Sequence, residues 1–322
     1  MRKRILITGF SGFVARHFVN YLVKNEIDIE IWGIDVVRPK YSLEECAGTL
    51  DIHFHEVDLL DKIKLNEVVK IVQPDYILHL AAFSSVAFSW ERPELSFSNN
   101  TNIFLNLIMA VKELGLKTRI LSVGSSETYG KYEAEAMPLS EEYELIPCNP
   151  YAVAKVSQEM LAKLFTEHYG MDIIITRSFN HIGPWQDSKF VVPGFVKKVM
   201  DLKEKGCTEG YIETGDLSVI RDFLDVRDVV RAYWMLLCDG KSGEVYNICS
   251  GKGTKLSEIL DEIGKIAGVK ATGVPSPKLI RPDENKMIIG SNQKMYRELG
   301  WKPEIDLRQT LEEMVFIVEG GE

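Results

Sequence analysis

The sequence predicts an α/β fold, a Rossmann-type doubly wound parallel sheet with a smaller mixed α/β substrate-binding domain. Short apolar runs rich in Ile, Leu and Val alternate with longer amphipathic segments through the first half of the chain. This alternation is typical of strand–helix–strand units around a parallel sheet. The length of 322 residues exceeds what one small core needs and fits a large domain plus a smaller partner.

The apolar runs predict six parallel strands, over residues 4–8, 30–35, 53–57, 76–80, 119–123 and 173–177. Helices are predicted between them, over residues 15–24, 65–71, 100–114 and 151–168. Further helices are predicted over residues 193–202, 226–237, 255–267 and 306–318. Because helix 228–237 and a strand over 245–248 are expected to return to the first sheet, we divide the chain into residues 1–178 with 226–251, and residues 179–225 with 252–322.

Composition excludes several classes of partner. The formal net charge of -9 argues against a nucleic acid or an anionic membrane, because both need a basic face that neutralises phosphates. The five cysteines are scattered, so neither a disulfide framework nor a zinc site is expected, and we predict no metal. The apolar run after the basic N-terminus covers only residues 5–7, and no later stretch approaches the roughly 20 apolar residues that span a bilayer. A cytoplasmic protein is therefore expected.

A glycine-rich turn follows the first predicted strand. Gly9 permits a tight turn, Gly12 lets the backbone approach a pyrophosphate, and Ala15 is small enough for close packing of helix on strand. The helix begins around Phe13 and Val14, so its free amides would face the phosphates. A turn without a ligand is the alternative, but the position at the first strand-to-helix turn favours dinucleotide binding.

Two carboxylates follow the next strands. Asp35 ends the second strand roughly 20 residues beyond the glycine turn, where a carboxylate would bind the adenosine ribose and repel a 2'-phosphate. NAD(H) is therefore preferred, although nearby Arg38 leaves NADP(H) possible and Asp35 could be only a turn residue. Asp58 closes the third strand, where it would reach the adenine or cap a helix.

Tyr151 and Lys155 lie one turn apart on one face of a predicted helix. A free tyrosine has a pKa of about 10. A neighbouring cation favours the phenolate, so we expect Tyr151 to exchange a proton near neutral pH. Lys155 could also hold the nicotinamide ribose. The spacing alone is a weak signal on any exposed helix, and its weight comes from combination with other residues.

The fifth strand runs into residues 124–130, which carry hydroxyls and a carboxylate to the same edge of the sheet. Ser125 could donate a hydrogen bond to a substrate oxygen that gains charge. Glu127 is either an acid or base, or a solvated charge. Ser126 and Thr128 are interpreted as ordinary turn residues.

Together these residues resemble the extended short-chain dehydrogenase/reductase family of nucleotide-sugar enzymes, over essentially the whole chain. Further marks are residues 79–82 (HLAA), Asn100 and Arg221-Asp222-Phe223. The most distinctive pieces are residues 82–86, 124–130, 179–184, 281–284 and 289–292, which are similar to reductases of GDP-4-keto-6-deoxy-D-mannose. The resemblance implies cofactor contacts from Leu59, Leu80, Ala81, Ala82 and Asn100. It implies substrate contacts from Ser84, Ser85, Asn180, Arg221, Arg281 and Glu284.

The resemblance also gives roles to the substrate residues. Asn180 would contact the sugar or its diphosphate, and Glu284 the ribose of the nucleotide. Arg221 and Arg281, expected on loops that close over a ligand, would clamp the diphosphate through charge-assisted bonds. Without the resemblance, both arginines would be interpreted as surface salt-bridge partners.

The expected reaction is reduction of the 4-keto group of a GDP-4-keto-6-deoxy-hexose by NAD(P)H, giving for example GDP-D-rhamnose. One residue departs from that reductase group, since Asp35 replaces a serine that precedes arginine and suits NADP. A 4,6-dehydratase or epimerase with tightly held NAD is the alternative, with Glu127 as the base, and a non-catalytic binding protein is a third reading. Helices 100–114 and 151–168 could pair in a homodimer.

Overall fold

A seven-stranded parallel sheet forms the centre of the molecule, with strand order β10-β6-β5-β4-β1-β2-β3. The computed structural model describes residues 2–42, 48, 50–279 and 285–320. The strands are β1 (Lys3–Thr8), β2 (Ile29–Asp35), β3 (Ile52–Glu56), β4 (Tyr76–His79), β5 (Arg119–Ser125), β6 (Asp172–Ser178) and β10 (Val245–Ile248). All six pairings in this sheet are parallel, so the predicted fold class is confirmed.

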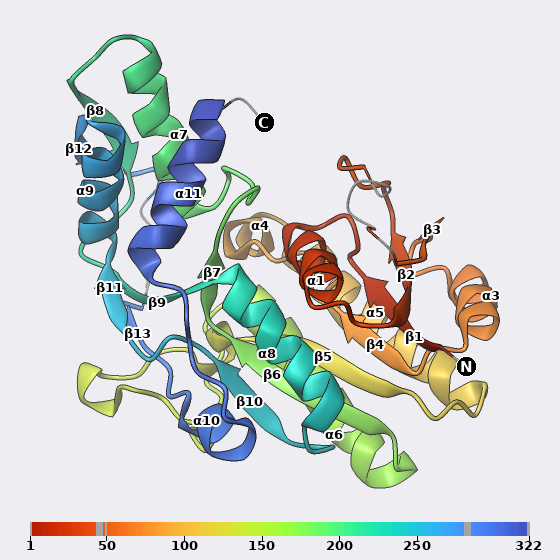
Figure 1. Ribbon diagram of the computed structural model, residues 1–322. Coiled ribbons are helices and arrows are strands. Elements are labelled where there is room, and N and C mark those ends of the chain that lie inside the picture. Colours follow the sequence, from red (N-terminus) through yellow and green to blue (C-terminus); the bar gives the residue numbers. More distant parts are fainter. Residues whose placement is uncertain (1, 43–47, 49, 280–284, 321–322) are drawn as a thin grey trace.

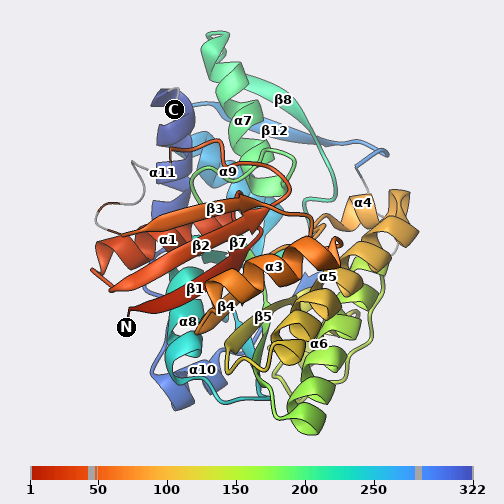
Figure 2. The ribbon, with the colours of Figure 1, turned by 90° about the vertical axis from the view of Figure 1, so that its right-hand side faces the viewer.

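Helices cover both faces of this sheet, because its strands carry apolar side chains on both sides. One face is covered by α1 (Phe13–Lys24) and α8 (Val226–Asp239), and the other by α3 (Lys62–Val72), α5 (Pro93–Glu113) and α6 (Pro150–Tyr169). Figure 2 shows the two layers on opposite sides of the sheet. Strand β10 pairs with β6, and α8 packs on α1.

The second half of the chain builds a separate core beside the sheet (Figure 1, upper left). Its helices are α7 (Val191–Glu204), α9 (Leu256–Ala267) and α11 (Leu307–Gly320). A small mixed sheet joins β7 (Asn180–Ile182), β9 (Ile220–Asp225), β11 (Gly253–Lys255) and β13 (Met287–Ile288). A parallel pair joins β8 (Glu209–Thr214) and β12 (Lys270–Pro275). This mixed α/β unit agrees with the smaller domain expected from the sequence.

The main differences from the sequence prediction are strands β7, β8, β9, β11, β12 and β13, which were not predicted, and several helices that are short or start early. Helices α4 (Val86–Glu91) and α10 (Gln293–Leu299) are too short to show a clear apolar period in sequence. Helix α5 begins at Pro93, well before the predicted residue 100, because proline fits the first helical position, where no amide donor is needed. The connection over residues 126–136 contains two short 3-10 helices, η1 (Ser126–Tyr129) and η2 (Ala134–Ala136).

Candidate functional site

A cavity of about 1280 Å³ lies where the parallel strands of the large sheet end. Its walls include residues at the carboxyl ends of β1 to β6, together with residues of β7, α7, β8 and β9 from the second half. Ligands of open α/β sheets bind at this edge. The cavity therefore has two halves: one is lined by the large parallel sheet, and the other by the smaller unit.

The glycine turn has the shape that a pyrophosphate needs. Gly9 has a φ of +68°, and a Cβ there would lie 2.8 Å from the amide nitrogen of Ala81. Gly12 is the N-cap of α1, so no side chain covers the first turn of that helix. Phe13, Val14 and the two glycines all line the cavity, which leaves the helix amides open to an anion. These residues fit the phosphates of a dinucleotide.

Asp35 lies on the cavity wall and is fixed by the turn beside it. Its Oδ2 accepts a hydrogen bond from the Ser11 amide at 2.9 Å, and its Oδ1 accepts one from the Val36 amide at 2.7 Å. Arg38 is exposed and outside the lining, whereas Lys40 belongs to it. The positive charge on this wall therefore comes from a lysine that the sequence analysis did not single out.

Asp58 and Leu59 also line the cavity. The carboxylate of Asp58 accepts the Leu60 amide at 2.9 Å, while Asp61 caps helix α3 through the Lys64 amide. The capping role considered for Asp58 thus belongs to Asp61, three residues later. Asp58 remains a lining residue of the dinucleotide half.

The loop after β4 supplies five of the expected residues to the lining, Leu80, Ala81, Ala82, Ser84 and Ser85. Ser85 caps α4 by accepting the Phe88 amide at 3.2 Å. Asn100 lies beneath this loop, only 1% exposed and outside the lining. Its side chain accepts from the Phe83 amide at 2.7 Å and donates to the Phe83 carbonyl at 3.1 Å. In this structure Asn100 supports the loop instead of facing the cavity.

Tyr151 and Ser125 both line the cavity, and Ser125 is the polar side chain that lowers the pKa of the phenol most. Burial raises the pKa of Tyr151 to about 12, and the charge of Glu127 also raises it. The expectation that a cation would shift this phenol toward neutral pH is therefore wrong for the protein without ligands. At neutral pH the phenol is protonated and can act as a proton donor.

The position of Lys155 explains why the pKa of Tyr151 is not lowered as expected. Its Nζ lies 6.0 Å from the centre of the Tyr151 ring and donates to the Val123 carbonyl and to Gln158 Oε1, both at 2.9 Å. The side chain is only 3% exposed, and burial lowers its pKa to about 7. The helical spacing places both groups in the cavity as predicted, but the lysine is held by other partners.

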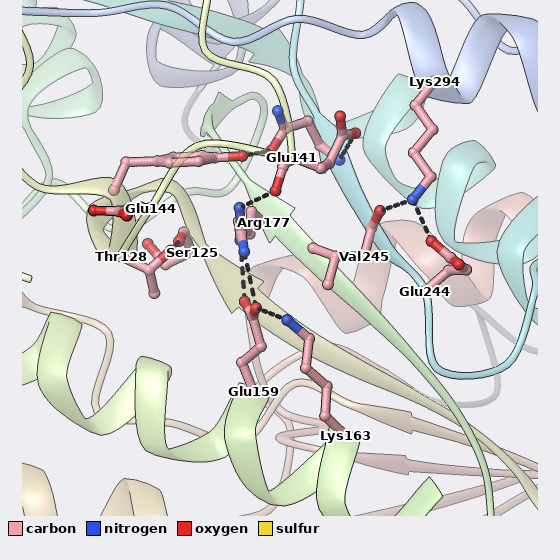
Figure 3. Close-up of polar contacts among 12 residues, drawn as sticks. Ser125, Thr128, Glu141, Glu144, Glu159, Lys163, Arg177, Glu244, Val245 and Lys294 are labelled. Carbon is pink, nitrogen blue, oxygen red and sulfur yellow. Dashed lines mark hydrogen bonds and ion pairs between the residues drawn. The ribbon is translucent and has the colours of Figure 1, made fainter. Parts of the chain in front are cut away.

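A buried ion pair anchors the helix that carries both residues. Arg177 of β6 donates from Nη2 to Glu159 Oε1 at 2.8 Å and from Nε to Glu159 Oε2 at 3.0 Å. Its Nη1 also donates to the Glu141 carbonyl at 3.0 Å, and Lys163 pairs with Glu159 at 2.8 Å (Figure 3). Because Glu159 lies one turn beyond Lys155, this fork fixes α6 against the end of the sheet.

Glu127 lines the cavity beside Tyr151. Its amide donates to Ser125 Oγ at 3.2 Å, and its Oε2 accepts from Asn149 Nδ2 at 2.8 Å. Thr128 donates to the Ser125 carbonyl at 2.7 Å, which is the turn role expected from the sequence. The Glu127 carboxylate is thus oriented by Asn149, the N-cap residue of α6.

The substrate half contains Asn180 and Arg221 in its lining. Arg221 belongs to strand β9, so the expectation of a loop position is wrong; the strand fixes its backbone by pairing with β11 and β13. Lys189 and Lys198 line the same region and were not found from the sequence, because nothing in their local pattern distinguishes them from surface lysines. Arg281 and Glu284 lie outside the described residues.

Among the described residues, no group of His, Cys, Asp and Glu side chains could hold a metal ion. Within the same residues, no helix is long and apolar enough to cross a membrane.

The parallel sheet, the open glycine turn and the Ser125, Tyr151 and Lys155 side chains on one cavity define a short-chain dehydrogenase/reductase. Comparisons with known proteins agree. The family model described as GDP-mannose 4,6 dehydratase matches residues 6–314. GDP-6-deoxy-D-mannose reductase of Pseudomonas aeruginosa is 34% identical over 97% of this chain and 95% of that protein.

Solved structures give the same picture. RMD from Pseudomonas aeruginosa, complexed with NADPH, superposes with a TM-score of 0.86 at 31% identity, covering 99% of this chain and 100% of that one. UDP-glucose 4-epimerase of Thermus thermophilus, in complex with NAD, has a TM-score of 0.85 at 26% identity over 99% and 100% of the two chains. The chain belongs to the GDP-mannose 4,6-dehydratase-like extended short-chain dehydrogenase/reductase family. It is an oxidoreductase that uses a nicotinamide cofactor and acts on a nucleotide sugar.

Proposed function

We propose that this protein reduces the 4-keto group of a GDP-4-keto-6-deoxy-hexose to give a GDP-6-deoxyhexose such as GDP-D-rhamnose. The observation that carries the proposal is that Ser125, Tyr151 and Lys155 line one cavity, with Tyr151 as a buried phenol whose pKa is raised to about 12. A reductase must deliver a proton to the oxygen of the former ketone, and a phenol that is protonated at neutral pH can do so. The 34% identity to a GDP-6-deoxy-D-mannose reductase supports the same reaction.

Each polar residue at the centre of the cavity has a role in this reaction. The cofactor that the Gly9 turn, Asp35 and Lys155 would hold is a nicotinamide dinucleotide, which when bound would supply the hydride for carbon 4 of the sugar. Ser125 donates a hydrogen bond to the ketone oxygen, where negative charge develops. Tyr151 gives its phenolic proton to that oxygen. Lys155 would bind the nicotinamide ribose.

The cofactor is proposed to be NAD(H) in preference to NADP(H). The Asp35 carboxylate on the cavity wall would bind two ribose hydroxyls and repel a 2'-phosphate. Lys40 lies on the same wall and is the residue that would attract such a phosphate. Asp35 is fixed by two backbone amides, whereas Lys40 is an exposed side chain, so the carboxylate is the better placed of the two.

The substrate is proposed to lie with its diphosphate near Arg221, Lys189 and Lys198, which bring positive charge to the second half of the cavity. This local charge is needed because the net charge of -9 opposes an anionic ligand. Asn180 would contact the sugar or its diphosphate, and Ser84 and Ser85 also line the cavity. Arg281 and Glu284 are proposed to complete the nucleotide subsite.

A 4,6-dehydratase or epimerase is the second candidate, and the position of Glu127 on the cavity wall favours it. A carboxylate there could remove the proton on carbon 5. The cofactor content of the purified protein separates the two reactions, since a dehydratase or epimerase keeps its NAD and a reductase exchanges it at every turnover. Protein that carries about one equivalent of NAD through extensive dialysis, and converts GDP-mannose without added NAD(P)H, would contradict the proposed reduction.

We also propose a homodimer formed through helices α5 and α6. These neighbouring helices expose several large apolar side chains: Leu95, Phe97, Val153, Met160 and Leu164. Apolar patches of this kind on helices are typical of subunit interfaces. The molar mass in solution, measured by light scattering, tests this arrangement.

A further inference from the structure

Asn149 connects the cap of the catalytic helix to a carboxylate in the cavity. Its Oδ1 accepts a hydrogen bond from the Ala152 amide at 2.8 Å and so caps helix α6. Its Nδ2 donates to Glu127 Oε2 at 2.8 Å. The two bonds are mutually consistent, because a rotated amide would place its nitrogen against the Ala152 amide and its oxygen against the carboxylate. The cap therefore fixes which atom of Asn149 faces Glu127.

We propose that Asn149 is a positioning residue that restrains Glu127, so that the enzyme reduces the ketone without removing the neighbouring proton on carbon 5. This inference rests on the proposed function. Asn149 itself does not belong to the cavity lining, so it would act through Glu127 and not on the substrate. Under this proposal, the hydrogen bond from Asn149 to Glu127 decides whether the enzyme only reduces the ketone or also removes the proton on carbon 5.

The chemistry explains why such a restraint is useful. The hydrogens on carbons 3 and 5 of a 4-keto sugar are acidic, because the electrons left behind enter the ketone as an enolate. A free carboxylate at Glu127 could take the proton from carbon 5, and solvent would return one to the same carbon. No electrons are gained or lost in this cycle. A 6-deoxy sugar has no hydroxyl on carbon 6 to eliminate, so exchange or inversion at carbon 5 would be the only result.

The hydrogen bond from Asn149 opposes this cycle in two ways. It is charge-assisted, so Glu127 must give it up or weaken it before accepting a proton; such bonds correspond to about a ten- to hundredfold change in equilibrium. It also ties Oε2 to the first turn of α6, where the partial positive charge of the helix N-terminus favours a negative group. Both contacts hold the Glu127 carboxylate in place on the cavity wall.

The test measures deuterium uptake at carbon 5 of GDP-4-keto-6-deoxy-D-mannose in D₂O, by NMR. The protein is loaded with oxidised NAD, so that no hydride is available and the ketone persists. Uptake at carbon 3 in the same sample and a sample without enzyme report spontaneous exchange. Asn149→Ser and Asn149→Thr both retain an oxygen that caps α6 but remove the amide donor to Glu127. Asp61→Ser exchanges the cap of α3, away from the cavity, and serves as the matched control.

We expect carbon 5 exchange to rise about ten- to hundredfold in both Asn149 variants, and to stay at the wild-type level in Asp61→Ser. Adding Glu127→Gln to Asn149→Ser should remove the gain, which a general loosening of the helix would not do. Unchanged carbon 5 exchange in Asn149 variants of an enzyme that reduces the keto sugar would overturn the positioning role and leave the proposed function standing. Failure of the wild-type protein to reduce the keto sugar at all would overturn the proposed function and this inference with it.

Discussion

The ammonium nitrogen of Lys155 lies 6.0 Å from the centre of the Tyr151 ring and donates its hydrogen bonds elsewhere, to the Val123 carbonyl and Gln158 Oε1. The phenol is therefore governed mainly by its own burial, which raises its pKa to about 12. This relationship suits a proton donor better than a base. Burial shifts the pKa values of the two groups in opposite directions, because it raises that of Tyr151 and lowers that of Lys155.

Replacing Tyr151 by phenylalanine should lower kcat by roughly a hundredfold or more, because the proton donor is lost while the ring still packs. Substrate and cofactor affinity, measured by calorimetry, should persist. Tyr169→Phe makes the same substitution at an exposed position at the end of the same helix and should leave kcat unchanged. Near-wild-type turnover of Tyr151→Phe would remove this residue from the mechanism.

The lowered pKa of Lys155, about 7 in the free protein, predicts a pH dependence of cofactor capture. A lysine is charged below its pKa and neutral above it, so kcat/KM for the dinucleotide should be level below pH 7 and fall about tenfold per pH unit well above it. In the cofactor complex the phosphate charges favour the ammonium, so the fall in kcat should lie at higher pH. Lys155→Met should be weakly active, without this fall. A wild-type kcat/KM that is constant from acidic to alkaline pH would refute the assignment.

Asp35 should make NADH at least as good a substrate as NADPH. Asp35→Ser is the most informative change, because the hydroxyl can still accept one of the two backbone amides that the carboxylate holds. Losing one negative charge beside the 2'-phosphate should shift the kcat/KM ratio toward NADPH by roughly tenfold. Steady-state kinetics with both cofactors measures the ratio. If the wild-type enzyme clearly prefers NADPH, Lys40 governs the choice, and Lys40→Ala should reverse it.

Arg221→Ala should raise the KM for the sugar nucleotide about ten- to hundredfold, because it removes charge-assisted bonds to the diphosphate. The affinity for the dinucleotide should not change, since its phosphates are proposed to bind at the Gly9 turn. Arg221→Lys should recover only part of the loss, because a point charge does not reproduce the planar fork. Arg308→Ala removes an exposed arginine that pairs with Glu262 and Glu312 and serves as the control. Normal sugar-nucleotide binding by Arg221→Ala would place the diphosphate elsewhere.

The features that depend on local sequence could be predicted, and those that depend on tertiary contacts could not. The Gly9 turn was found because its glycines follow an apolar strand directly, and Tyr151 and Lys155 because four residues make one helical turn. By contrast, the hydrogen bond from Lys155 to the Val123 carbonyl joins residues on different elements, and no pattern in the sequence indicates it. The pKa of Tyr151 was misjudged for this reason.

The residues of the substrate half of the cavity could not be predicted for the same reason, because they are far apart along the chain. Lys198 is one of many lysines in the sequence, and only the packing of α7 on α9, α11 and β8 brings it to the cavity. Arg221 was expected on a loop because its strand, β9, pairs with short strands far away in sequence. Asn149 was not singled out in the sequence, because its contact with Glu127 depends on how β5 and α6 meet.

The central claim is best tested by incubating the purified protein with GDP-4-keto-6-deoxy-D-mannose and 4-deuterated NADH or NADPH. The account predicts a loss of reduced-cofactor absorbance equal to the amount of product formed, with one deuterium on carbon 4 of a GDP-6-deoxyhexose. Tyr151→Phe should reduce both signals together. No loss of absorbance from either cofactor, together with conversion of GDP-mannose to its 4-keto-6-deoxy form without added cofactor, would contradict it.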